Sequence, residues 1–232
     1  MKKIGISQSN YAPWLGYFEL IAQCDTFILL DTVQFTKNDW RNRNKIQSTS
    51  KSSTVKWFTV PVTVPFGLST SIDQVVVSDS NWTTKHRNMI HHAYSNFIDY
   101  KKLEYFLDEL YFSVKELTSL SEINSIFIRE ICQLLFIKTQ ILQAPLVISD
   151  NRNGRLIELC KFFASSTYVS STGAQHYLEI DNFQKNGVKV EFCDFKKSKD
   201  FYSTHYRNDE YLSVFDSIFR FGLDKVRTAL YE

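Results

Sequence analysis

Cysteine is scarce in this 232-residue chain, and glycine, proline and methionine are also few. The four cysteines are scattered and no two of them form a CxxC pair, so neither a metal site nor a disulfide framework is indicated. They stand at Cys24, Cys132, Cys160 and Cys193. No apolar run approaches the roughly 18 residues needed to span a bilayer, and no signal-peptide pattern precedes the first apolar segment. We therefore expect a cytoplasmic protein without a membrane-spanning segment.

The sequence also lacks the short motifs of the common catalytic classes. It contains no GxGxxG, GxxxxGK[ST], HExxH or GxSxG, so standard dinucleotide-binding, NTPase, zincin and hydrolase interpretations have no support. A net charge of +2 is too weak for a dedicated nucleic-acid binder, which carries a pronounced basic face. With 44% hydrophobic and 22% charged residues, the chain is expected to fold around a packed core as a single domain, residues 1–232.

The sequence does contain a dense polar stretch, residues 31–46, directly after an apolar run. Its amide and charged side chains stand beside two aromatic residues: Gln34, Lys37, Asn38, Asp39, Arg41, Asn42, Arg43, Asn44 and Lys45, with Phe35 and Trp40. Surface loops usually favour small residues and turn formers. Arginine and amide side chains instead make bidentate hydrogen bonds to phosphate, carboxylate and base or sugar edges. We interpret the stretch as a loop that binds an anionic small molecule; a solvated hairpin connection is the alternative.

The first thirty residues predict a compact strand–helix–strand unit. Lys3–Ser7 and Thr26–Leu30 are short apolar runs, and between them apolar residues recur at helical spacing after Pro13. In such units the ligand binds beyond the carboxyl ends of the strands. Polar and aromatic side chains stand at both ends: Gln8, Asn10, Tyr11 and Trp14 after the first strand, Asp31 and Gln34 after the second. The two loops are therefore expected to face one cleft.

The middle of the chain predicts strands and then helices. Residues 55–64 are strongly β-forming, and residues 72–77 are expected to form a hairpin set with them. Apolar periodicity predicts helices over 82–97, 100–117 and 122–136, which we interpret as a helical insert subdomain covering residues 82–140. His86, Ile90 and Tyr94 share one face of the first of these helices. A histidine on such a face is either a packing residue or a catalytic base.

The last third returns to alternating helices and strands. A helix is expected over 156–163, strands over 168–170 and 188–194, and one or two helices over 211–230. Ser171 and Gly173 lie in a small-residue turn after the 168–170 strand, followed by Tyr177. Such a turn can present backbone N–H groups to an anion, although a plain strand-to-helix turn is equally compatible. We predict an α/β fold with a mixed, mainly parallel central sheet built on the N-terminal unit.

Several of these stretches resemble the WbqC-like protein family over nearly the whole chain. The matching segments are Gln8–Phe18, Asp31–Phe35, Trp40–Asn44, Trp57–Val62, Trp82 with His86 and Tyr94, Arg155–Ile157, and Tyr168–Ser170 with Gly173 and Tyr177. The chain has Ser9 where the family usually has proline, and Thr32 where it usually has a second acid. The resemblance thus points to Asp31 as the acid that matters. The family is associated with gene clusters for the O-antigen of lipopolysaccharide and other bacterial surface polysaccharides.

The resemblance implies a role in building or decorating a nucleotide- or lipid-linked sugar, but it does not by itself fix the reaction. Our first hypothesis is a transferase that acylates or aminoacylates an amino sugar. In this hypothesis His86 is the catalytic base and Asp31 its orienting partner. The other expected site residues bind the substrate, hold its diphosphate, stack on it or stabilise the oxyanion: Gln8, Asn10, Tyr11, Trp14, Gln34, Trp40, Arg41, Asn42, Arg43, Tyr94, Ser171, Gly173 and Tyr177. No tightly bound cofactor is expected. Coenzyme A or an acyl carrier protein would supply the thioester, and the oligomeric state stays open.

Two other function classes fit parts of the sequence. The opening unit is reminiscent of nucleotidyltransferases, which activate a small acid or sugar with a nucleoside triphosphate. However, Gln8 and Asn10 stand where an HxGH-like pair is expected. A non-catalytic scaffold of glycan assembly is the other alternative, against which the many convergent polar groups argue. A metal-dependent glycosyltransferase is disfavoured because no DxD loop follows Leu30.

Overall fold

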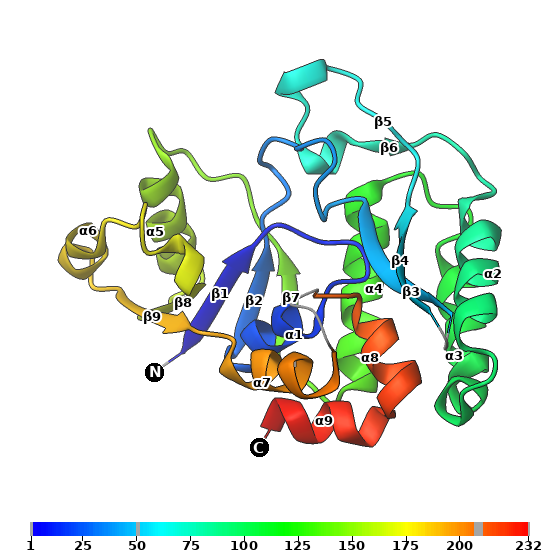
Figure 1. Cartoon of the computed structure of the whole chain (residues 1–232). Coiled ribbons are helices and arrows are strands. Elements are labelled where there is room, and N and C mark those ends of the chain that lie inside the picture. Colours follow the sequence, from blue (N-terminus) through cyan, green and yellow to red (C-terminus); the bar gives the residue numbers. More distant parts are fainter. Residues whose placement is uncertain (1, 50–51, 207–210, 232) are drawn as a thin grey trace.

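Five parallel strands form the centre of the molecule, seen in a computed structural model that describes residues 2–49, 52–206 and 211–231. The strands are β1 (Lys3–Ser7), β2 (Thr26–Leu29), β7 (Gln140–Gln143), β8 (Thr167–Ser171) and β9 (Lys189–Cys193). Their order in the sheet is β7-β2-β1-β8-β9 (Figure 1). The chain thus builds the sheet outward from β1 in one direction and then, from β8 on, in the other. The predicted α/β fold is confirmed, and every pairing in this sheet is parallel.

The predicted N-terminal unit is present as β1, α1 (Leu15–Ala22) and β2. All four residues of β2 are buried, and so are the three central residues of β1. Burial on both faces is what a parallel sheet covered by helices requires, and it explains why these strands read as continuous apolar runs. The strands pair in register from Ile4 with Thr26 to Ser7 with Leu29. Both therefore end at the same edge of the sheet.

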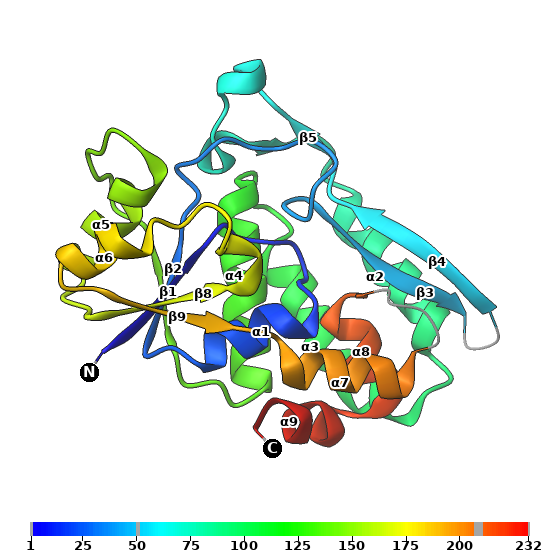
Figure 2. The ribbon, with the colours of Figure 1, turned by 60° about the vertical axis from the view of Figure 1, so that its left-hand side comes forward.

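Helices cover both faces of the sheet, so the molecule has three layers (Figures 1 and 2). Alternate side chains of β2 point to opposite sides: Phe27 joins one apolar core and Ile28 the other. The larger core contains α1, α4 (Leu120–Leu134) and the C-terminal helices. The smaller core lies under α5 (Arg152–Phe162) and α6 (Ile180–Lys185).

A two-stranded antiparallel ribbon stands beside the sheet and corrects two predictions. It pairs β3 (Arg43–Thr49) with β4 (Ser52–Thr59). The second half of the predicted binding loop is therefore a strand, and β4 pairs with this strand instead of with residues 72–77. The sequence did not show the alternation of apolar and polar residues that predicts a strand, because the buried face of β3 carries an asparagine, Asn44, as well as Ile46.

The predicted hairpin of residues 55–64 and 72–77 survives only as a short pairing of β5 (Val62–Thr63) with β6 (Val76–Val77). Pro61 separates β4 from β5, because proline has no backbone N–H to donate to a neighbouring strand. Two 3₁₀ turns lie between the short strands, η1 (Gly67–Ser69) and η2 (Ile72–Gln74). Residues 72–74, expected as strand, form the second of these turns.

The three helices predicted in the middle of the chain are present as α2 (Trp82–Tyr94), α3 (Ile98–Ser113) and α4. Helix α2 packs on β3, and α3 packs on α2, α4 and α8 (Val214–Phe221). Their apolar faces belong to the same core as α1. The separate insert subdomain over 82–140 stays a prediction.

The C-terminal region ends in α8 and α9 (Leu223–Tyr231), which fulfil the predicted tail helices. Helix α7 (Lys196–His205) was not predicted. Its composition is lysine-rich, and its first turn is capped from another helix. The buried Glu19 of α1 accepts hydrogen bonds from the backbone N–H groups of Ser198 at 2.8 Å and Lys197 at 3.3 Å.

Candidate functional site

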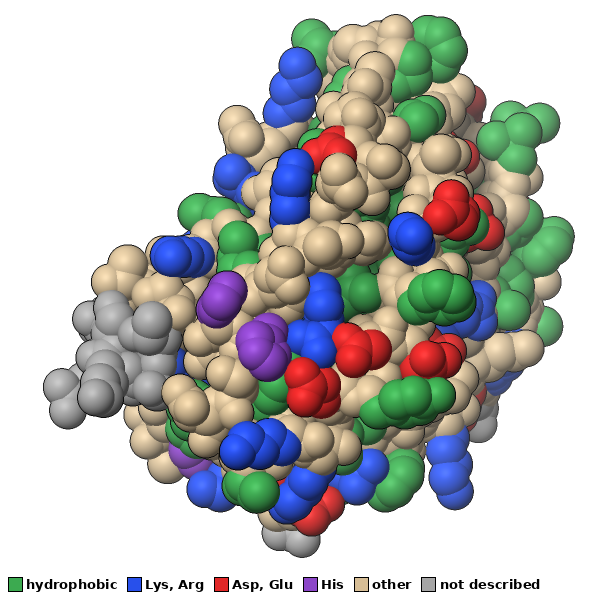
Figure 3. Space-filling view, turned by 90° about the vertical axis from the view of Figure 1, so that its right-hand side faces the viewer, with side chains coloured by type: hydrophobic (Ala, Val, Ile, Leu, Met, Phe, Trp, Pro, Cys, Tyr) green, Lys and Arg blue, Asp and Glu red, His purple; other side chains and the backbone are tan. Residues whose placement is uncertain are grey.

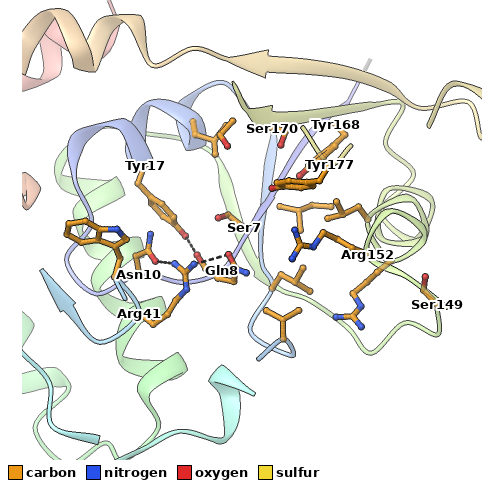
Figure 4. A pocket seen from close by; sticks show the side chains of 18 of the residues that line it. Ser7, Gln8, Asn10, Tyr17, Arg41, Ser149, Arg152, Tyr168, Ser170 and Tyr177 are labelled. Carbon is orange, nitrogen blue, oxygen red and sulfur yellow. Dashed lines mark hydrogen bonds between the residues drawn. The ribbon is translucent and has the colours of Figure 1, made fainter. Parts of the chain in front are cut away.

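A cleft of about 590 Å³ opens at the carboxyl ends of β1 and β8 (Figure 4). This is the point where the strand order reverses direction, which is where α/β proteins bind ligands. The volume suits a small-molecule site. The lining side chains that the following argument uses are Gln8, Asn10, Tyr17, Trp40, Arg41, Asp150, Arg152, Arg155, Tyr168, Ser171 and Tyr177.

Arg41 enters the cleft from the side of β1 and is held there by amide side chains. Its guanidinium donates to Gln8 Oε1 at 3.1 Å and to Asn10 Oδ1 (Figure 4). The carboxylate of Asp39 is 3.6 Å from Nη2. The Arg41 side chain is only 15% exposed. Its two hydrogen-bond acceptors in the cleft are neutral, so they fix the direction of the guanidinium without adding a counter-charge. The Asp39 carboxylate, which does not line the cleft, offsets part of the charge of Arg41.

A buried polar network fixes the loop after β1 and the backbone of Arg41. Asp31 accepts hydrogen bonds from the backbone N–H of Ser9 at 2.8 Å and from the Ser121 hydroxyl. Asn124 of α4 donates to Ser9 Oγ at 3.1 Å and to the Arg41 carbonyl at 2.8 Å. Burial raises the pKa of Asp31 above its ordinary value, although these hydrogen bonds oppose the shift. The network thus joins the ends of β1 and β2 to α4.

The opposite wall of the cleft is the start of α5. Asn151 caps this helix, since its side chain accepts from the backbone N–H of Gly154 at 2.8 Å. Arg152 and Arg155 follow in the first turn and line the cleft. The Arg152 guanidinium lies 4.7 Å from the centre of the Tyr177 ring, a cation–π contact. Figure 4 shows Arg41 and Arg152 on two sides of the cleft, with Ser7 and Gln8 between them.

The cleft has a positive charge balance. Among the described residues its lining contains three guanidinium groups, Arg41, Arg152 and Arg155, and one carboxylate, Asp150. Within the described chain Arg152 and Arg155 form no ion pair with a carboxylate. The N-terminus of α5 adds the partial positive charge of a helix end. Such a cleft favours an anion that carries several acceptor oxygens, as a diphosphate does.

Tyrosine side chains complete the walls. Burial raises the pKa of the Tyr17 phenol well above its ordinary value, and burial also raises the pKa of Tyr168. Both phenols therefore stay neutral at physiological pH. Tyr17 donates to the Gln8 carbonyl at 3.0 Å. Tyr177 is 47% exposed and presents its ring at the rim.

Residues 8–228 match the WbqC-like protein family. The chain belongs to this family. The match covers both walls of the cleft, from Gln8 to Tyr177, which confirms the resemblance seen in the sequence. An uncharacterized protein of Mycobacterium tuberculosis is 32% identical to the chain over 225 residues, 97% of this chain and 96% of the relative. No solved structure matches the chain significantly. No helix in the described ranges is both long and apolar enough to cross a membrane.

The structure of this WbqC-like chain brings part of the predicted site together. The predicted residues that line the cleft are Gln8, Asn10, Trp14, Trp40, Arg41, Ser171 and Tyr177. They come from the segments after β1, before β3 and after β8, which are far apart in the sequence. Their roles in binding a substrate stay predictions.

The expected pair of His86 and Asp31 is not formed. His86 is buried among aromatic rings, where Nδ1 contacts the Tyr11 hydroxyl at 2.9 Å and Nε2 contacts the Thr59 carbonyl at 3.1 Å. Burial lowers the pKa of the imidazole to about 4. Asp31 bonds instead to Ser9 and Ser121, and neither His86 nor Asp31 lines the cleft. The catalytic role of His86 stays a prediction, but the partner assigned to it was wrong.

The remaining predicted residues lie outside the cleft for identifiable reasons. Asn42 is buried and donates to the Val60 carbonyl at 2.9 Å. Arg43 stacks on the Trp57 ring at 4.1 Å, on the outer side of the ribbon. Tyr94 is buried and donates to Asp216. Gln34 is exposed and bridges Ser71 through its backbone.

Two more of the predicted site residues lie outside the cleft. Tyr11 contacts His86 and Tyr111 in the core. Gly173 lies in the turn η3 (Thr172–Ala174) and does not line the cleft.

Sequence reasoning missed the α5 wall. Arg152 and Arg155 lie in the first turn of α5, the helix that follows β7 in the chain, and a helix that follows a parallel strand is a signal for a site at the carboxyl edge of the sheet. That signal was not used because residues 140–148, interrupted by Pro145, gave no clear strand. In the structure only the first four of these residues form β7.

Proposed function

We propose that this WbqC-like chain is a transferase that acylates or aminoacylates a nucleotide- or lipid-linked amino sugar in bacterial surface polysaccharide biosynthesis. The observation that supports it best is the set of three arginines around a cleft at the reversal point of the sheet. The diphosphate of the sugar substrate would bind between Arg41 and Arg152. Both guanidinium groups can donate two parallel hydrogen bonds to such a group.

The rest of the cleft suits a sugar and its attached base. The neutral phenol of Tyr168 would donate to a sugar hydroxyl group or accept from one. Tyr17, whose O–H donates to the Gln8 carbonyl, would accept from one. Trp40 and Tyr177 present partly exposed rings on which a sugar or a base would stack. Asp150 would bind the ammonium group and accept its proton, because it is the carboxylate that lines the cleft within the described chain.

Acyl transfer would be direct, from thioester to amine. The amine nitrogen forms a bond to the acyl carbon, the carbon–sulfur bond breaks, and the proton passes through Asp150 to the leaving thiolate. An enzyme-bound thioester is disfavoured because all four cysteines are buried. Burial raises the pKa of Cys132 and Cys160 to about 12 and that of Cys193 to about 11, so these thiols stay protonated.

A nucleotidyltransferase is the second candidate, favoured by one observation. The order β7-β2-β1 is that of a mononucleotide-binding half, and the cleft opens directly after β1. In that case a nucleoside triphosphate would occupy the same arginines, and the reaction would release pyrophosphate.

A thermal-shift screen separates these proposals. The ligands are a uridine diphosphate-linked amino sugar, a coenzyme A thioester and ATP, tested on the wild type and on Arg152→Ala/Arg155→Ala. The matched control is Lys161→Ala, which removes a cation from the far end of the same helix. A ligand that binds only the folded state raises the melting temperature by mass action.

The transferase proposal expects a shift with the amino-sugar nucleotide that the double variant loses and the control keeps. A shift with ATP alone would replace it by the nucleotidyltransferase. If none of the ligands changes the melting temperature of any of the proteins, both enzyme proposals are contradicted and the non-catalytic scaffold is the remaining interpretation.

A further inference from the structure

The outer face of α3 carries an apolar stripe that no described part of the chain covers. Ile98 is 63% exposed, Tyr105 74% and Phe112 73%. They are spaced seven residues apart, which is 20° short of two helical turns, so they lie in one row along the helix. The opposite face of α3 packs into the core through Leu107 and Leu110. Isolated exposed apolar residues are ordinary, but a row of three large ones marks a contact surface.

Charged residues flank this row in an ordered way. Lys101 and Lys102 precede Tyr105, and Asp108 and Glu109 follow it. Figure 3 shows hydrophobic side chains separated by acidic and basic ones on the side of the molecule where α2 and α3 lie. Lys102 already contacts Asp99 at 3.2 Å, and Asp108 contacts Arg87. The Lys101 and Glu109 side chains are exposed and have no ionic partner within the described residues.

The arrangement of apolar and charged residues on α3 complements that of a second copy of α3 that runs in the opposite direction. If two copies of α3 lie antiparallel with the two-fold axis at Tyr105, each residue faces the one at the same distance on the other side. Ile98 then meets Phe112, and Lys101 meets Glu109, twice each by symmetry. Tyr105 meets Tyr105. A parallel arrangement would instead place like charges together, which is unfavourable.

We propose that a second copy of this chain is the partner of the α3 face, in an antiparallel two-fold dimer. Such an interface is isologous, and self-complementary charge is what it requires. A single pair of helices presents a small area, so the dimer is weak and depends on protein concentration. The cleft opens at the carboxyl ends of β1 and β8 and no residue of α3 lines it, so both clefts stay open in the dimer (Figures 1 and 4).

Charge reversal tests the proposal by sedimentation velocity over a series of concentrations at low salt. Glu109→Lys places two lysines together at two symmetric positions, and we expect it to weaken dimerisation about tenfold or more. The double variant K101E/E109K restores opposite charges and is expected to restore the dimer. Leu146→Ser is the matched control, since Leu146 is 88% exposed but lies away from α3.

The proposal is supported if the wild type and control dimerise, E109K stays monomeric, and the double variant dimerises again. A wild type that remains monomeric at every soluble concentration overturns it. So does a dimer that E109K leaves unchanged, or one that the double variant does not restore. Ligand binding in the cleft is measured separately on the same samples, so this result does not depend on the proposed activity.

Discussion

Arg41 donates to the side chain of Gln8 at 3.1 Å across 33 residues of sequence, and this bond joins the segment before β3 to the end of β1, at the edge of the sheet where the cleft opens. The acceptor is neutral, so this bond orients the arginine without adding a counter-charge to it. An arginine held in this way before the ligand arrives loses little conformational entropy when it binds an anion.

Replacing Arg41 should therefore weaken binding far more than it weakens the fold. Arg41→Ala removes charge-assisted hydrogen bonds, and we expect affinity for a diphosphate-linked sugar to fall on the order of 10- to 100-fold. Arg41→Lys keeps the positive charge but cannot form two parallel hydrogen bonds, so we expect its affinity to lie between those of the wild type and Arg41→Ala. Isothermal titration calorimetry measures this. Equal affinity in all three proteins would remove Arg41 from the binding site.

Asn124 is expected to act on the cleft from a distance. It is fully buried and bonds both Ser9 and the Arg41 backbone. Asn124→Ala leaves these acceptors unpaired and should cost about 2 kcal/mol of unfolding free energy. It should also weaken ligand binding, since Arg41 loses its support. Urea unfolding and calorimetry together check this, with the exposed Asn96→Ala as control. A loss of stability with unchanged affinity would show that the network is structural alone.

His86 should make stability depend on pH. Its pKa is about 4 in the folded protein against an ordinary value of 6.5, because burial disfavours the charged ring. The folded state thus prefers the neutral form. The associated stability is fully present above pH 6.5 and is lost as the pH falls toward 4, by about 3 kcal/mol at most.

Urea unfolding between pH 7 and pH 4 tests this against His86→Gln. Glutamine can contact the Tyr11 hydroxyl and the Thr59 carbonyl but does not titrate. The stability of the wild type relative to this variant should decrease as the pH falls. A constant difference would mean that the ring is charged or solvated. If the variant also retains turnover in a transferase assay, the catalytic role predicted from the sequence is excluded.

Glu19 should be important for the docking of α7. It is 3% exposed and accepts from two N–H groups in the first turn of that helix, whose N-cap residue Phe195 makes no side-chain cap bond; Asp194 accepts from the N–H of Lys196 at 3.0 Å. Glu19→Ala should cost about 2 kcal/mol, and Glu19→Gln less, because the amide oxygen can still accept. Glu116→Ala is the control, since its side chain is 89% exposed. Thermal unfolding provides the comparison, and equal melting temperatures for Glu19→Ala and the control would refute the cap.

The local pattern of the sequence was sufficient for the elements that obey simple rules. Apolar runs identified β1 and β2, and helical periodicity identified α2 to α4. It failed where tertiary contacts decide the structure. Strand β3 buries Asn44, whose side chain donates to the Ala12 carbonyl at 2.7 Å, a partner that no local pattern reveals. Helix α7 depends on a cap from α1.

The candidate site was predictable in part for the same reason. Topology placed Gln8, Asn10 and Arg41 at one edge, because parallel strands end together. His86 and Asp31 were chosen by residue type, and type alone does not say that one is enclosed by aromatic rings and the other by Ser9 and Ser121. Arg152 was missed because residues 140–148, interrupted by Pro145, gave no clear strand before α5.

A crystal structure of the chain with a uridine diphosphate-linked amino sugar tests the central claim most directly. We expect the diphosphate between Arg41 and Arg152, with the sugar against Tyr17 or Tyr168 and its amine facing Asp150. A ligand bound elsewhere on the molecule, or an amine that points away from Asp150 into the protein wall, would contradict it.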